Sequence, residues 1–359
     1  MTCSENRRFE RHVRAANVVA ICALSLAACG RSASHPTATS DAGPKKETFQ
    51  LVFEHLDGAL MSISGSSSSD VWAVGGDTRD GKGALVLHYD GSQWTRQDSG
   101  ASADLWWVHV FGPKSIMMGG TKGTILHYDG SAFTKMTTPV MSTVYGVWGA
   151  SEDDVWAVGG EPDAEPGFLW HYDGSTWSDA SDMLPADVQG KSLFKVWGRA
   201  GDDAWIVGLD GVAVHWDGSA LETATTGTSD RLFTVHGTAD GKTLVAVGGD
   251  ASGVIAERVG TKWHTLSPAP APTQLFGVFM RSADLGYAVG YDGTVLERGA
   301  SAWKLLDIGV ELPNPFHAVW VDPDGGVWAV GGDLLNGPAP TDGMLVHKGK
   351  MVSDAMATP

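Results

Sequence analysis

The chain has little cysteine, little basic charge and no long hydrophobic run beyond its N-terminal segment, and each shortage excludes a class of protein. Its three cysteines are Cys3, Cys22 and Cys29, so the rest of the chain can form no disulfide framework and carry no thiol chemistry or cysteine-ligated metal. Lys and Arg number 25 against 42 Asp and Glu, and the formal net charge is −17. Such an acidic surface repels phosphate backbones, so we expect no nucleic-acid binding.

Recognisable catalytic motifs are missing as well. The sequence contains no GxSxG nucleophile elbow, no phosphate-binding glycine loop and no HExxH metal motif. After residue 28, no segment approaches the ~18 uninterrupted apolar residues that a membrane-spanning helix needs. The sequence therefore predicts a protein that is not an enzyme, has no cofactor and holds no metal.

Residues 1–28 have the pattern of an export signal. Four Arg precede a mostly apolar stretch, 17–28, that is too short to span a membrane as a mature helix. The sequence LAACG, which ends at Gly30, resembles the bacterial lipobox, and this resemblance implies that Cys29 is lipidated and becomes the new N-terminus. An ordinary cleaved signal with an incidental cysteine is the alternative. Removal of residues 1–28 takes away four Arg and two Glu and makes the net charge −19.

Residues 29–47 connect this expected anchor to the rest of the chain. They are rich in Ser, Thr, Ala and Pro and have no apolar period, which predicts a disordered tether. A flexible coil of this length spans roughly 20–25 Å. Gly30 and Ser32 follow the anchor without an Asp retention signal, which favours the outer membrane of a bacterial cell envelope, on its periplasmic side or at the surface.

Glycine and tryptophan are abundant, with 47 and 15 residues, and they recur in a repeated unit. Residues 144–178 show the unit best: four short apolar runs are separated by an acidic turn, Gly-Gly and Asp-Gly. Seven copies align on the centre of the second run, at Trp72, Ile116, Trp156, Trp205, Val245, Tyr287 and Trp328. A period near 43 residues with four strands is the signature of a β-propeller blade. The fold class is therefore all-β: a seven-bladed propeller over residues 48–352.

The two ends of the repeat predict how the ring closes. An unassigned apolar run at 48–55 precedes the first copy, and the last copy has only three clear strands. We expect residues 48–55 to supply the missing outer strand of the seventh blade, which removes the open sheet edges. The alternative is that residues 350–353 form this strand. Residues 353–359 are expected to be a flexible tail.

The turn between the third and fourth strands is the strongest local signal. It reads HYDGSQW from His88 and HYDGSTW from His171, and Asp-Gly favours a two-residue type I′ hairpin. Together with VWAVGG ahead of it, the unit resembles kelch-type and BNR-type propeller repeats, and the resemblance covers nearly all of residues 48–350. It also resembles repeats of secreted and lipid-anchored bacterial proteins. The resemblance implies a propeller and carries no activity.

Two recurring polar groups suggest metal sites but have structural explanations. The histidines of the third strand lie on separate blades and cannot converge on one ion, so we expect a structural role for His88, His127, His171, His215 and His347. Acidic turns such as Asp153-Asp154 and Asp202-Asp203 fit residues that cap their own backbone. Calcium is the alternative for these turns.

Recognition is expected where the copies differ. The loops that follow second strands or join blades emerge on one face and vary in length and composition; they cover residues 77–83, 161–167, 181–191, 267–273, 311–315 and 333–342. Near the axis, one column of the innermost strands is mostly small, so its large members, taken as His109 and Lys195, are expected at the channel mouth, as contacts or as a plug. The candidate binding residues are Trp106, Trp107, His109, Lys195, Arg231 and His317.

These observations favour a monomeric, lipid-anchored scaffold that binds an envelope protein or polysaccharide and contacts the membrane only through its anchor. A lectin-like carbohydrate binder is the first alternative, because exposed tryptophans can stack on sugars. A degenerate glycosidase or lyase is the second.

Overall fold

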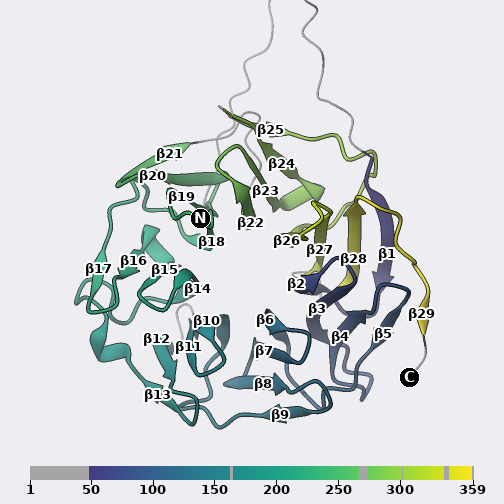
Figure 1. The fold of residues 1–359 in the computed structure, drawn as a ribbon, viewed down its shortest axis with the longest axis horizontal. Helices are drawn as coiled ribbons and strands as arrows, with labels where there is room; N and C mark the ends of the chain where they lie inside the picture. Colours follow the sequence, from purple (N-terminus) through teal and green to yellow (C-terminus); the bar gives the residue numbers. More distant parts are fainter. Residues whose placement is uncertain (1–47, 162–164, 267–273, 301, 335–338, 358–359) are drawn as a thin grey trace, which may run out of the picture. The chain divides into compact units, whose positions relative to one another are not determined.

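Residues 48–161, 165–266, 274–300, 302–334 and 339–357 are described by a computed structural model. They form seven antiparallel sheets arranged around a common axis, as Figure 1 shows. In six sheets the first strand lies nearest the axis and the following strands lie progressively farther out. In the seventh sheet the outermost strand comes from the N-terminal end of the described chain. The predicted seven-bladed β-propeller of four-stranded blades is confirmed.

The first four blades follow the chain in order. Blade 1 comprises β2 (Leu60–Ser67), β3 (Asp70–Asp77), β4 (Ala84–Tyr89) and β5 (Trp94–Arg96). Blade 2 comprises β6 (Leu105–Gly112), β7 (Ser115–Gly120), β8 (Thr124–Tyr128) and β9 (Phe133–Lys135). Blade 3 comprises β10 (Val144–Ser151), β11 (Asp154–Glu161), β12 (Glu165–Tyr172) and β13 (Trp177–Asp179). Blade 4 comprises β14 (Leu193–Ala200), β15 (Asp203–Gly208), β16 (Ala213–Trp216) and β17 (Leu221–Thr223).

The remaining blades complete the ring. Blade 5 comprises β18 (Leu232–Gly237), β19 (Thr243–Gly248), β20 (Val254–Val259) and β21 (Lys262–Leu266). Blade 6 comprises β22 (Leu275–Ser282), β23 (Leu285–Gly290), β24 (Val295–Arg298) and β25 (Trp303–Leu305). Blade 7 comprises β26 (Phe316–Val321), β27 (Val327–Asp333), β28 (Thr341–Lys348) and, on its outside, β1 (Gln50–Leu56). The 3-10 turns are η1 (Ser181–Met183), η2 (Leu209–Gly211) and η3 (Tyr291–Gly293).

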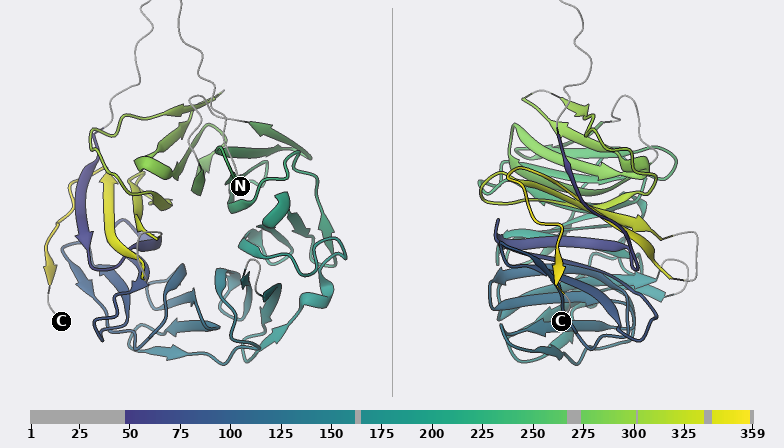
Figure 2. Two further views of the ribbon diagram at one scale, coloured as in Figure 1. Left: turned by 180° about the vertical axis from the view of Figure 1, so that it is seen from behind. Right: turned by 90° about the vertical axis from the view of Figure 1, so that its right-hand side faces the viewer.

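The ring is closed at both ends of the described chain. β1 pairs antiparallel with β28, as expected for the N-terminal run, so residues 350–353 do not form the outer strand. The tail departs from expectation, because β29 (Met356–Ala357) pairs in parallel with β5 of blade 1. Between the two ends, the Gln50 side chain donates to the Val352 carbonyl at 2.7 Å and accepts from its N–H at 3.0 Å. Figures 1 and 2 show β29 along the outer edge of blade 1.

The hydrophobic core lies between the blades rather than within them. In the described part of the chain, seven clusters of buried residues each combine side chains of two adjacent blades. The cluster between blades 7 and 1 contains Phe53 of β1, Trp94 and Trp328, which are each less than a tenth exposed. Each sheet therefore buries both faces only when its neighbours are present.

A glycine lies at or near the end of the second strand of every blade because the neighbouring backbone leaves no room for a side chain. A Cβ on Gly75 would lie 1.9 Å from the Ala59 carbonyl oxygen, and one on Gly248 would lie 1.9 Å from that of Arg231. In blade 2 the matching residue is Gly120, whose Cβ would lie 2.3 Å from the Asp104 oxygen. The centre of β7 is therefore Met117, which pairs with His127, and not Ile116. This one-residue correction matters at the axis.

The histidine column belongs to a repeated tryptophan–histidine–aspartate contact. In blade 4, the rings of Trp205 and His215 stack with centroids 4.4 Å apart, and His215 Nε2 lies 2.8 Å from the Asp203 carboxylate. Blades 1 and 3 repeat the contact with Trp72, His88 and Asp70 and with Trp156, His171 and Asp154. The structural role of these histidines is confirmed. The backbone-capping role expected of the acidic turns is wrong at these three aspartates, which bind the histidine of the next strand. It is confirmed at Asp322 in blade 7, whose carboxylate accepts the Gly326 N–H at 2.8 Å.

The Asp-Gly turns differ from the predicted type I′ geometry. Tyr89 pairs with Trp94, which leaves a four-residue loop, and only Gly91 has positive φ, at 89°. The Asp90 carboxylate accepts the Ser92 hydroxyl at 2.7 Å and the N–H groups of Ser92 and Gln93 at 2.8 and 2.9 Å. These bonds, led by the one from the Ser92 hydroxyl, lower the pKa of Asp90 to about 2. The aspartate side chain therefore fixes the turn.

Candidate functional site

A collar of mostly aromatic side chains surrounds the propeller axis at one end. The second residue of each innermost strand supplies it: Met61, Trp106, Tyr145, Phe194, Phe233, Phe276 and His317. From blade 2 to blade 7, each ring contacts the next, with centroids 5.2 to 5.7 Å apart. These are the separations of edge-to-face and tilted aromatic pairs.

A β-bulge places each collar residue. In all seven blades the pairing of the first two strands shifts between the first and third residues of the inner strand, as between Leu60 and Ser62 in blade 1. The first residue is buried against a neighbouring blade, while the second is left out of the ladder. A bulge re-aims a side chain in this way, here toward the axis.

The collar encloses a cavity of about 250 Å³, which we call the axial pocket. Its lining is completed by Trp107, Lys195, Arg231, Thr234 and Leu334. Arg231 precedes β18 and Leu334 follows β27, so the pocket lies at the face that carries the loops between blades and after second strands. This is the face on which recognition was expected.

Trp107 and Lys195 form the floor of the pocket. Both are third residues of their strands, where the other blades have small or short side chains: Ser62, Gly146, Thr234, Gly277 and Ala318. Small residues are needed because the inner strands are close together; a Cβ on Gly146 would lie 3.1 Å from the Lys195 Cα. Lys195 reaches past Gly146, donates to the Tyr145 carbonyl at 3.0 Å, and holds its Nζ 3.3 Å from the centre of a Trp107 ring.

The charged and titratable groups of the pocket are basic or neutral. Lys195 is only 7% exposed, and burial holds the pKa of its ammonium well below the usual range. Burial also lowers the pKa of His317 to about 4, and its Nε2 lies 3.0 Å from the Gly332 carbonyl. Arg231, at the mouth, forms an ion pair with Asp250. No Asp or Glu lines the pocket in the described part of the chain.

Five of the six predicted binding residues line this pocket, and one does not. Trp106, Trp107, Lys195, Arg231 and His317 are brought together. His109 is not at the channel mouth, because the corrected alignment of blade 2 puts Trp107 in the axial column. His109 instead packs against Phe111, with ring centroids 4.6 Å apart, and burial lowers its pKa to about 4.

The sequence patterns did not predict four further aromatic residues of the collar. Tyr145, Phe194, Phe233 and Phe276 each follow a buried first residue of an inner strand. The signal was present as an aromatic residue at one fixed place in successive repeats. It was hidden because the repeats were aligned on the second strand, whose register slips by one residue in blade 2.

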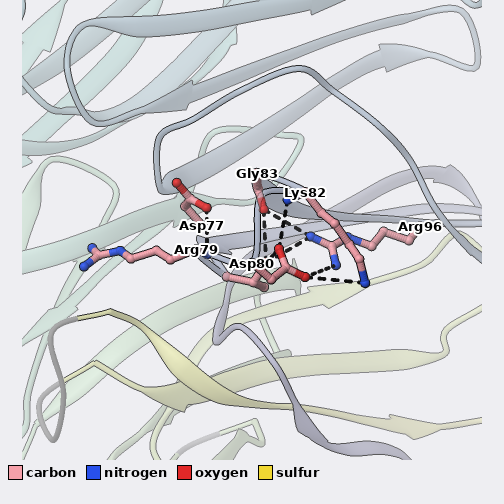
Figure 3. Close-up of polar contacts among 7 residues, drawn as sticks. Asp77, Arg79, Asp80, Lys82, Gly83 and Arg96 are labelled. Carbon is pink, nitrogen blue, oxygen red and sulfur yellow. Dashed lines mark hydrogen bonds and ion pairs between the residues drawn. The ribbon is translucent and has the colours of Figure 1, made fainter.

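The variable loops have different local structures. In blade 1, ion pairs hold loop 77–83: the Asp80 carboxylate lies 3.4 Å from the Lys82 ammonium and 3.7 Å from the Arg96 guanidinium (Figure 3). Arg96 also donates a hydrogen bond to the Gly83 carbonyl at 3.1 Å. Residues 162–164, 267–273 and 335–338 of the other expected loops lie outside the described residues. Near blade 3, an open hollow of about 540 Å³ includes the exposed Val140 and Met141, but it has no basic side chain and no collar.

Two further findings concern the described residues only. They contain no group of three or more His, Cys, Asp or Glu side chains placed to hold a metal ion. They also contain no helix that is long and apolar enough to cross a membrane. Cys29 and the expected signal and tether, residues 1–28 and 29–47, lie outside them.

Comparison with solved structures shows the fold. "YCF48 bound to D1 peptide" superposes with a TM-score of 0.62 at 15% identity, covering 89% of this chain and 100% of the other. YCF48 from Cyanidioschyzon merolae gives 0.63 at 12%, covering 84% and 98%, and the WD40 β-propeller domain of Doa1 gives 0.61 at 11%, covering 85% and 98%. No family model and no curated protein matches the sequence, so the kelch-type and BNR-type resemblance remains an expectation. What these likenesses show is a β-propeller.

Proposed function

We propose that this chain is a non-catalytic scaffold that binds polypeptide segments through the axial pocket and the loops around it. The observation that carries the proposal is the aromatic collar above a buried lysine, at the face with the variable loops. Aromatic side chains and a few placed polar groups are typical of sites that recognise peptides and small ligands. One similar propeller is described as bound to a peptide, which supports the same use here.

Binding to a random hexapeptide display library tests this proposal. We expect the chain to select peptides from the library. Phe233→Ala should lower the affinity for the selected peptides by about tenfold or more, because two ring contacts of the collar are lost. Val259→Ala, at an exposed site on β20, is the control and should leave binding unchanged. Selection that survives loss of the collar would contradict the assignment of the site.

Carbohydrate binding is the second candidate, because sugar rings also stack on aromatic faces. A cavity of about 250 Å³ lies below the ~300–1,000 Å³ usual for small-molecule sites, which favours a single inserted group over an oligosaccharide. A glycan array separates the two candidates: binding that depends on Phe233 would favour the sugar.

We further propose that the chain is exported and anchored, as a monomer, through a lipid on Cys29 at the outer membrane of a bacterial envelope. The lipobox-like sequence supports this. Metabolic labelling with a palmitate analogue should mark the chain, and Cys29→Ser should abolish the label and move the chain to the soluble envelope fraction. A labelled Cys29→Ser variant would contradict the anchor.

A further inference from the structure

The floor of the axial pocket supplies a positive group that no carboxylate of the described residues neutralises. Lys195 is buried, its hydrogen bond goes to a backbone carbonyl, and its ammonium lies over Trp107. It takes part in none of the ion pairs formed by the described residues. An ammonium buried without an anion destabilises a fold. Its position in a pocket therefore indicates that an anionic ligand binds there.

We propose that the axial pocket binds the C-terminal end of a polypeptide, with Lys195 binding the terminal carboxylate and the collar packing against an apolar last side chain. This inference rests on the proposed function and names its ligand.

The polar groups around the pocket select an anion. Lys195 uses one N–H for the Tyr145 carbonyl, and its other N–H groups have no hydrogen-bond partner among the described residues. Arg231 lies at the mouth, where Asp250 already pairs with its charge, so Lys195 is the positive group left for a ligand. The described lining therefore offers the Lys195 ammonium and no carboxylate, which complements a carboxylate ligand.

The size and apolar wall favour a chain end over an internal acidic residue. A cavity of about 250 Å³ accepts one residue more readily than a folded-back loop. A terminal residue carries its carboxylate and its apolar side chain on the same Cα, so both can be satisfied together. An internal Asp or Glu would place its flanking backbone amides against the collar, where they would lose hydrogen bonds to water.

Three fluorescein-labelled pentapeptides test the inference with the purified full-length chain, by fluorescence anisotropy. The first is Gly-Ser-Gly-Ser-Phe with a free C-terminus, the second is its amide, and the third is the amide Gly-Ser-Glu-Phe-Gly with an internal glutamate. We expect the free acid to bind at least about tenfold more tightly than either amide, the effect of one charge-assisted hydrogen bond.

Variants of the floor assign this preference to Lys195. Lys195→Met fills the same space without a charge and should make the acid and amide bind equally, whereas Lys195→Arg should retain a preference for the acid. Lys242→Met is the matched control, because Lys242 is 80% exposed on a turn and should leave the preference unchanged.

The outcomes distinguish failure of the carboxylate proposal from failure of peptide binding as a whole. Equal binding of acid and amide to the unmodified chain, both weakened by Phe233→Ala, would overturn the carboxylate and leave the collar as a peptide site. Tighter binding of the internal-glutamate peptide would overturn the assignment of a chain end as the ligand. If all three peptides and the hexapeptide library fail to bind, the proposed function fails with the inference.

Discussion

The buried ammonium of Lys195 should destabilise the fold by a measurable amount. Lys195→Met should raise the free energy of unfolding at pH 7 by about 1–2 kcal/mol, because relief from burying an ammonium exceeds loss of the Trp107 contact. Burial lowers the folded-state pKa below the unfolded value. The gain is therefore full below the folded pKa and shrinks as the pH rises toward about 10. Urea unfolding across this range measures it; a variant less stable at pH 7 would contradict it.

Asp203 stabilises the tryptophan–histidine unit of blade 4 in a way its neighbour cannot. Asp203→Ala leaves His215 Nε2 without its acceptor at 2.8 Å and should cost about 1–3 kcal/mol. Asp202→Ala should change stability by less than about 0.5 kcal/mol, because none of its side-chain oxygens accepts a hydrogen bond from the described residues. Chemical denaturation of both variants measures the difference. Similar losses for both would mean that the histidine contact contributes little.

Individual side chains mark the limit of what the sequence predicts. Lys195 was predicted because a large side chain interrupts a column of small ones, and Trp107 because it adds a second aromatic residue to its strand. His109 was misplaced because the register of the second strand slips by one residue in blade 2. Four collar aromatics were missed because an alignment on the second strand does not show the bulges that aim the second residue of each inner strand at the axis. The partners of Asp70, Asp154 and Asp203 were likewise missed, because their histidines follow 12 to 18 residues later on the next strand.

Among the strands, β1 has the clearest energetic role, because it closes the ring from the other end of the chain. Phe53→Ala should cost about 3–5 kcal/mol, since Phe53 is buried between blades 7 and 1 and its ring lies 5.8 Å from that of Trp94. Glu54→Ala, at the adjacent exposed position, should cost under about 0.5 kcal/mol. Calorimetric melting of both variants checks this. Equal melting temperatures would show that β1 is a peripheral flap.

The strands themselves could be predicted, but the turns between them could be predicted only in part. Alternating apolar residues and the closing glycines identified four strands in each unit. The Asp-Gly pair located the turn, yet Ser92 and Gln93 determine its geometry by donating to Asp90. The pairing of β29 could not be foreseen, because a two-residue strand has no periodicity to read.

For the ring as a unit, net charge should govern how fast a ligand arrives. The acidic chain should repel an anionic peptide, whereas the proposed carboxylate site at the floor of the pocket would attract its C-terminal end. Two lysines placed before the terminal apolar residue should raise the association rate at 0.02 M salt by about tenfold over two glutamates, and the difference should vanish near 1 M salt. Stopped-flow anisotropy measures both rates. A salt-independent difference would point to direct contacts instead.

The number of blades and the closing strand follow from the sequence because both depend on a period repeated many times. One misaligned copy, blade 2, does not change the count of seven. A binding site depends instead on the features that set single copies apart, so one misaligned residue there removes His109 from the axis and adds Trp107.

The pairing of β1 with β28 also determines when the ring can close during synthesis. The first described strand has no sheet to join until the last blade has been synthesised, some 290 residues later. A product that terminates early, or is cleaved before β28, keeps two open sheet edges and cannot complete its ring. Because the closing contacts join the two ends of the sequence, folding should be slow and should finish late. Only a full-length copy can therefore complete the propeller, and under the proposed export this delay would keep the chain unfolded until all of it has crossed the membrane.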